Sequence, residues 1–180
     1  MRKLTVEELG RMNSDQFRLS SKLPVTIVLD NVRSLYNIGS VFRTCDAFRI
    51  EQIFLCGITA TPDKSLAEIH KTALGAENTV KWNHFKDTSD AVKLLIAEGY
   101  NVIAVEQVDK SRKLGEYDIE EGHYALIFGN EVKGVRQDVV DMCDSALEIP
   151  QYGTKHSLNV SVSVGIVLWE FALRLNKYLR

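Results

Sequence analysis

The strongest constraint on the fold is an alternation of short apolar segments with segments of helical periodicity, which begins at Pro24. The first apolar run is almost uninterrupted, as in a strand that is covered on both faces. Glycines follow several helical segments, where helices commonly end. The pattern predicts an α/β fold, a parallel sheet with helices on both faces. The expected strands are 25–29, 52–56, 79–82, 101–105, 124–128 and 146–149, and the expected helices are 38–48, 63–74, 89–98 and 136–142.

After Pro150 the chain forms a loop and then a long apolar stretch that continues to the C-terminus. Pro150 cannot donate to a sheet ladder, so the strand before it ends there. Apolar residues then recur at steps of three and four, which predicts a helix buried over much of its circumference. Ser157, Asn159 and Ser161 fall in its first turn, where they either cap free amides or close a loop over a ligand. The apolar sets are Leu158, Val162, Ile166 and Trp169, and Val160, Val164, Val167 and Phe171.

The composition fits one globular domain, because 45% of the 180 residues are hydrophobic. We assign residues 23–180 to this domain and residues 1–22 to a helical, basic arm in which Thr5 and Glu8 match a capping box. The net charge of −2 argues against a protein that coats polyphosphate chains, but it allows a local basic patch. Candidates for this patch are Arg33, Arg43 and Arg49, with Arg11 and Arg18 of the arm.

Cys45, Cys56 and Cys143 have the spacing of neither a metal site nor a disulfide framework. We therefore expect reduced thiols, a cytoplasmic protein and no metal. No segment has the length of a membrane span or the pattern of a signal peptide.

Ligands of parallel α/β sheets bind beyond the carboxyl ends of the strands, so loops 30–37, 105–115, 129–135 and 150–157 are the candidates for a site. In the first of them, Asn37 can cap the following helix. Arg43 falls opposite the apolar stripe of that helix, and Gly39 leaves the backbone bare one turn earlier. Arg43 is then either a solvated surface arginine or part of an anion site beside the helix start.

The loop after 124–128 contains Gly129, Glu131 and Gly134, and it matches neither nucleotide-binding fingerprint. A P-loop requires Lys and then Ser or Thr after its second glycine, whereas Val135 and Arg136 follow here. Glu131 is open to two interpretations, a surface turn residue or a member of a site at the edge of the sheet. His156 and Ser157 lack the sequence context of a hydrolase nucleophile.

Taken together, the segments 37–43, 127–134 and 149–161 resemble the three motifs of the SpoU/TrmH group of SPOUT-class RNA 2′-O-methyltransferases. The motifs occur in the order of that family, and the resemblance covers residues 24–175. It implies a homodimer and a C-terminal part threaded into a deep trefoil knot. Pattern reasoning alone would have excluded a knot, because knotted folds are so rare.

The resemblance also implies that S-adenosylmethionine binds in the loops of the knot and that no metal takes part. The residues that match the cofactor positions are Val105, Glu106, Gly129, Ile149, Ser157 and Leu158. Arg43 matches the catalytic arginine. The resemblance implies four further catalytic residues at the other polar motif positions, Asn37, Glu131, Ser157 and Asn159. Because a guanidinium stays protonated, we assign Arg43 to the RNA phosphate and to the developing alkoxide charge, and a proton relay through it stays open.

The implied partner is structured RNA, and the motifs are shared by enzymes that act on tRNA and on ribosomal RNA. The absence of a large appended RNA-binding domain favours a compact substrate such as tRNA, with ribosomal RNA as the alternative. Two readings from other classes remain: a non-catalytic RNA-binding module on the same fold, and an unrelated doubly wound domain that binds a small phosphorylated ligand.

Overall fold

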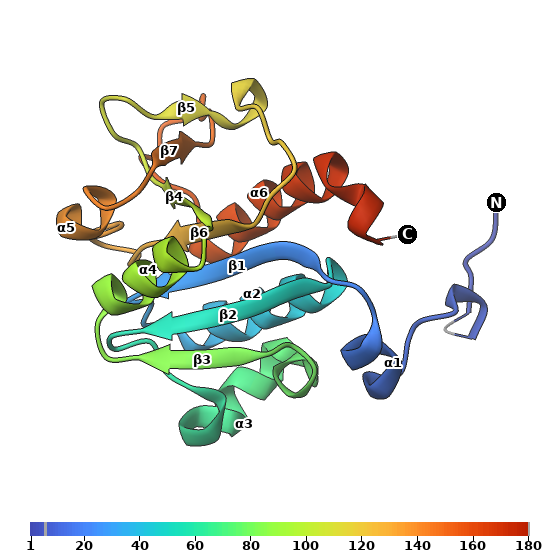
Figure 1. Cartoon of the computed structure of the whole chain (residues 1–180). Coiled ribbons are helices and arrows are strands. Elements are labelled where there is room, and N and C mark those ends of the chain that lie inside the picture. The colour runs from blue at the N-terminus through green and yellow to red at the C-terminus, as the bar shows by residue number, and fades with distance from the viewer. Residues whose placement is uncertain (6, 180) are drawn as a thin grey trace.

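The computed structural model describes residues 1–5 and 7–179 and contains a seven-stranded sheet in the order β3-β2-β1-β6-β4-β7-β5 (Figure 1). Every paired strand is parallel to its neighbour. This confirms the predicted parallel α/β fold. The strands are β1 (Leu23–Asp30), β2 (Ile50–Cys56), β3 (Trp82–Phe85), β4 (Asn101–Val105), β5 (Arg112–Lys113), β6 (Tyr124–Phe128) and β7 (Ser145–Glu148).

Helices cover both faces of the sheet, and the sheet divides the core into two apolar clusters. Strand β1 is buried along its whole length, and its side chains alternate between the clusters because successive residues point to opposite faces. Ile27 and Leu29 pack with α2, α3 and α6, whereas Val28 packs with α4 and α5. The helices are α1 (Ser14–Leu19), α2 (Leu35–Ala47), α3 (Pro62–Ala73), α4 (Thr88–Ala97), α5 (Gln137–Val140) and α6 (Val160–Arg174), with 3-10 turns at Glu7–Leu9, Ala76–Asn78, Leu114–Glu116 and Asn176–Leu179.

The C-terminal helix α6 is buried on one face only, which corrects the prediction of burial over much of its circumference. Phe171 lies against Tyr124 with ring centroids 5.1 Å apart. The opposite face exposes large apolar side chains, and 57% of Trp169 is accessible. The buried set is Val160, Val164, Val167, Leu168 and Phe171, and the exposed set is Val162, Ile166, Trp169 and Leu173.

Several predicted element boundaries were wrong. Helix α2 starts at Leu35 rather than 38, since the side chain of Ser34 accepts a hydrogen bond from the Asn37 amide at 3.3 Å. Asn37 is therefore not the cap. Helix α3 begins after Thr61 rather than with a cap at Asp63. The strand expected at 79–82 lies at 82–85, because the residues before it form a 3-10 turn, and the short strand β5 was not predicted.

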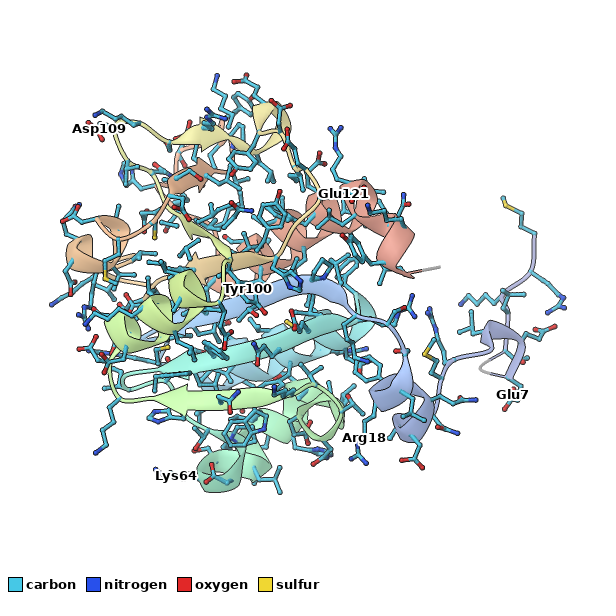
Figure 2. The ribbon with its side chains drawn as sticks, viewed as in Figure 1. Glu7, Arg18, Lys64, Tyr100, Asp109 and Glu121 are labelled. Atoms are coloured by element: carbon cyan, nitrogen blue, oxygen red, sulfur yellow. The ribbon has the colours of Figure 1, made fainter. Side chains whose placement is uncertain are left out.

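The N-terminal arm contains short helical pieces and docks on the domain through one apolar side chain. Phe17 of α1 is 6% exposed and belongs to the larger core cluster, and Arg18 donates to the carbonyl oxygen of Asn78 at 3.4 Å. Thr5 and Glu8 exchange the reciprocal bonds of the predicted capping box. The arm lies beside the amino ends of the strands (Figure 1), and Figure 2 shows Glu7 and Arg18 on this side of the molecule.

Cys45, Cys56 and Cys143 are free thiols, as predicted. Burial and the nearby Asp30 carboxylate raise the pKa of Cys56 to about 12, and burial beside Asp144 raises that of Cys143 to about 12. Among the described residues no helix is both long and apolar enough to cross a membrane.

Candidate functional site

Loops from the carboxyl ends of β4, β6 and β7 enclose a cavity of about 360 Å³. The last turn before α6 and the first turn of that helix complete its wall. Parallel strands end at the same edge of a sheet, so loops far apart in the sequence meet there. All six residues predicted for the cofactor line this cavity: Val105, Glu106, Gly129, Ile149, Ser157 and Leu158.

The loop after β6 is held in a tight turn. Asn130 and Gly134 exchange backbone hydrogen bonds of 3.0 and 2.8 Å, and Gly134 has a φ of +67°. The Asn130 side chain accepts from the Val132 amide at 2.9 Å and donates to the Asn31 carbonyl oxygen at 2.8 Å. A β-carbon on Gly129 would come within 2.0 Å of Gly134, so only glycine fits there. The turn therefore forms one rigid side of the cavity.

Glu106 stabilises the same turn from the end of β4. Its Oε2 accepts from the Val135 amide at 2.9 Å, and its Oε1 accepts from the Gln107 amide at 2.9 Å. Both carboxylate oxygens thus have backbone donors. Glu106 lines the cavity, and these contacts give it the role of shaping the wall.

A line of hydrogen-bonded side chains connects the segments 37–43, 127–134 and 149–161. Asn37 Nδ2 donates to Glu131 Oε1 at 3.0 Å, and Asn159 Nδ2 donates to Asn37 Oδ1 at 3.1 Å. Asn159 Oδ1 accepts from the amide of Ser161 at 2.9 Å and so caps α6. We call Asn37, Glu131 and Asn159 the polar triad. The structure thus brings together three of the five residues predicted as catalytic.

Ser157 lies on the rim of the cavity, and its side chain is exposed. It is not the cap of α6, because Asn159 takes that position. The neighbouring carbonyl oxygen of His156 accepts from Gln107 Nε2 at 3.0 Å. That bond ties the loop before α6 to the loop after β4.

Arg43 lies apart from the cavity and from the polar triad. It is exposed on α2, about 9 Å along the helix axis from Asn37 at 1.5 Å per residue. Within residues 1–5 and 7–179 its guanidinium makes no hydrogen bond or ion pair. Gly39 is not a bare patch beside Arg43: a β-carbon there would lie 2.2 Å from Thr72 Oγ1, so this glycine allows α2 to approach α3 closely.

Asp30 is a supporting residue that the sequence analysis missed. It is 1% exposed, and its carboxylate accepts from Thr88 Oγ1 at 2.5 Å and from the Arg136 amide at 3.0 Å. It thereby joins the end of β1 to α4 and to the segment after the β6 loop. The signal was a charged residue at the end of an apolar run, since such residues are buried only with hydrogen-bond partners.

No group of three or more His, Cys, Asp or Glu side chains in the described part of the chain could hold a metal ion. With the cavity, the polar triad and the parallel sheet in place, comparison with known proteins identifies the family. The model of the SpoU rRNA Methylase family matches residues 24–169.

The chain belongs to the SpoU family.

This confirms the predicted resemblance and rules out the reading as an unrelated doubly wound domain. Among relatives of this SpoU-family chain is the tRNA (guanosine(18)-2′-O)-methyltransferase of Thermus thermophilus, 29% identical over 81% of this chain and 73% of the relative. The 23S rRNA (guanosine-2′-O-)-methyltransferase RlmB of Neisseria meningitidis is 31% identical over 83% of this chain, which spans 58% of that relative.

Solved structures of the SpoU family share the fold. An AdoMet-bound rRNA methyltransferase from Sinorhizobium meliloti superposes with a TM-score of 0.77 and 27% identity, and covers 87% of this chain and 61% of its own. A TrmH/SpoU tRNA modifying enzyme from A. aeolicus superposes with a TM-score of 0.80 and 25% identity, and covers 93% of this chain and 86% of its own.

Proposed function

We propose that this protein transfers a methyl group from S-adenosylmethionine to a ribose 2′-hydroxyl of structured RNA. The observation that carries the proposal is that two of the three motif segments line one cavity and that the polar triad joins the third segment to them. Relatives named as 2′-O-methyltransferases of tRNA and of 23S rRNA support it.

The cavity suits S-adenosylmethionine in size and chemistry. A volume of about 360 Å³ lies within the range of small-molecule pockets. Val105, Ile149 and Leu158 offer apolar contact to the adenosine, and Gly129 lines the same cavity in the tight turn after β6. When bound, the cofactor supplies an electrophilic methyl group on a sulfonium. Ser157 and the fixed loops orient it towards the polar triad.

Arg43 binds the RNA phosphate beside the target ribose and stabilises negative charge that develops on the attacking oxygen. Since Arg43 lies outside the cavity of its own chain, we propose that it serves the cavity of a partner subunit. A homodimer that buries the exposed face of α6 supplies this arrangement, because a two-fold interface places the same patch of both subunits together.

The proposed deep trefoil knot accounts for how the cavity loops are held. Residues 106–123 contact the C-terminal part through Gln107, which donates to the His156 carbonyl oxygen, and through Glu121, which pairs with Lys177. These contacts support a C-terminal segment threaded through that loop. We keep residues 23–180 as the catalytic domain and residues 1–22 as an arm that Phe17 anchors. The free thiols support a cytoplasmic location.

We favour tRNA as the substrate, with ribosomal RNA as the alternative. Mass-spectrometric nucleoside mapping of total tRNA and rRNA from a deletion strain tests the choice. Loss of one 2′-O-methylated nucleotide from tRNA supports the proposal, and loss from 23S rRNA favours the alternative. An unchanged nucleoside profile would count against methyl transfer.

The other alternative is a non-catalytic RNA-binding module. A cofactor that binds only the native state raises the melting temperature, so thermal unfolding with S-adenosylhomocysteine distinguishes the two. We expect a concentration-dependent rise. RNA binding without any rise would favour the module.

A further inference from the structure

The cavity contains three carboxylates, those of Glu106, Glu131 and Glu148. None of them forms an ion pair within the described part of the chain. They differ in the hydrogen bonds that their oxygens accept, and this difference indicates different roles.

Both oxygens of Glu106 are engaged by the backbone, because each accepts a hydrogen bond from an amide at 2.9 Å. Glu148 Oε2 accepts from Ser111 Oγ at 3.0 Å, on the side of the cavity next to β5 at the edge of the sheet. Both carboxylates therefore help to build the wall of the cavity on the side away from α2.

Glu131 differs because it faces the starts of α2 and α6. Its Oε1 is fixed by Asn37 Nδ2 at 3.0 Å, and Asn37 is fixed in turn by Asn159. The direction of these bonds is determined, since the Asn159 oxygen takes the Ser161 amide and leaves its amino group to donate. The triad thus orients the Glu131 carboxylate, while its Oε2 accepts no hydrogen bond from residues 1–5 and 7–179.

We infer that Glu131 is the proton acceptor of the methyl-transfer reaction. This inference rests on the proposed function. The ribose 2′-oxygen forms a bond to the methyl carbon, and the bond from that carbon to sulfur breaks, with its electron pair staying on sulfur. The hydroxyl proton passes to Glu131 Oε2 and then to water. Asn37 and Asn159 are positioning residues for this step.

A carboxylate suits this step better than the guanidinium of Arg43, which stays protonated and has no acceptor atom. Attack on a sulfonium makes the hydroxyl proton far more acidic as the new bond forms. A weakly basic carboxylate then suffices, provided that it lies within hydrogen-bond reach. Arg43 therefore stabilises the developing charge, and Glu131 removes the proton.

The test is Glu131→Gln, which keeps the shape of the side chain and an oxygen for Asn37. Single-turnover methylation should slow by at least about a hundredfold, on the scale of losing a general base. Affinities for S-adenosylmethionine and RNA, measured by calorimetry, should change by less than about threefold, since the charge and not the fold is altered. Glu98→Gln, an exposed carboxylate on the surface after α4, is the matched control.

Chemical rescue provides a second readout that a structural role would not produce. In Glu131→Ala, added formate should restore part of the rate in proportion to its concentration, and chloride at equal ionic strength should not. A parental rate for Glu131→Gln, or a slow Glu131→Ala that formate leaves unchanged, would overturn the inference. If the wild-type protein methylates no RNA while it binds the cofactor, the proposed function fails instead.

Discussion

At the scale of single residues, Arg43 is separate from the cavity that we propose for the cofactor. The cavity is lined by loops after β4, β6 and β7, whereas Arg43 extends from the middle of α2 into solvent. We therefore expect the two groups of residues to act on different parts of the reaction, and substitutions can tell them apart.

Arg43→Ala should reduce methyl transfer by about a hundredfold or more, the usual scale for losing a group that stabilises an oxyanion. Its affinity for S-adenosylmethionine should stay unchanged, because Arg43 does not line the cavity. Arg43→Lys should restore little, since an ammonium lacks the two-pronged geometry of a guanidinium. Calorimetry and single-turnover assays on the same variants check both points, and a parental rate for Arg43→Ala would make it an ordinary surface arginine.

Asn159→Ala should weaken both cofactor binding and stability. Asn159 caps α6 and holds Asn37, so the variant loses about 1 kcal/mol of helix capping and frees the triad next to the cavity. Asn13→Ala is the matched control, because it removes the cap of α1 in the arm. Denaturant unfolding should show that Asn159→Ala lowers the stability. Calorimetry should show weaker cofactor binding for Asn159→Ala and not for Asn13→Ala. Equal cofactor affinity in both variants would contradict a role at the site.

At the scale of elements, the turn between α3 and β3 depends on a buried carboxylate. Glu77 is 4% exposed and accepts from His70 Nδ1 at 2.6 Å and from the Gly75 amide at 3.0 Å. Burial raises the pKa of Glu77, but the hydrogen bonds from His70 and the backbone outweigh it and leave that pKa below its ordinary value.

Glu77→Gln should therefore lower the free energy of unfolding by about 1–3 kcal/mol at pH 7. A lowered folded pKa means that the contribution is complete above the ordinary glutamate pKa of about 4.3 and disappears as the pH falls through the folded value. Urea unfolding at pH 7, 5 and 3 should show the difference between variant and parent shrinking only at the lowest pH. A difference that is the same at all three would contradict the assignment.

At the scale of the whole molecule, the exposed face of α6 predicts a homodimer. Ile166→Glu puts a charge into the proposed interface and should yield monomers at micromolar concentration, because burying an unpaired charge is costly. Leu94→Glu, on the exposed side of α4, is the control and should leave the dimer intact. Light scattering measures both, and a parent that is monomeric with full activity would refute the dimer.

The same dimer predicts subunit complementation. Arg43→Ala and the cavity variant Leu158→Asp should each be inactive alone. Random mixing should restore about a quarter of the sites if Arg43 acts on the partner's cavity, because half of the dimers are mixed and each has one intact site. Methylation by the refolded mixture measures this, and no recovery would place Arg43 in the site of its own subunit.

The basic patch predicted from the sequence is spread over the molecule. Arg33 precedes α2 and Arg49 follows it, so about 20 Å of helix separates them. Arg49 donates to the carbonyl oxygen of Leu179, and the arm lies at the amino ends of the strands. Arg33 and Arg43 are therefore the arginines of the patch nearest to the cavity. Deleting residues 1–22 would also remove the core residue Phe17. Charge substitutions such as Arg11→Gln are therefore a better test of whether the arm contributes to RNA binding.

The sequence by itself determined the parallel sheet and the lining of the cavity. Uninterrupted apolar runs such as 25–29 must be covered on both faces, and the loops after parallel strands must emerge at one edge. Val105, Gly129 and Ile149 could therefore be assigned to one site from their positions after predicted strands, together with the family resemblance.

Only the tertiary structure decided which side chains meet. Asn37 looked like a helix cap, yet its partners are Glu131 and Asn159, 94 and 122 residues away. Local capping could be judged from neighbours, but a bond across such a separation depends on how whole elements pack. For the same reason periodicity predicted a helix that is apolar over much of its circumference, whereas packing against the sheet decided which face is buried and left the face with Trp169 exposed.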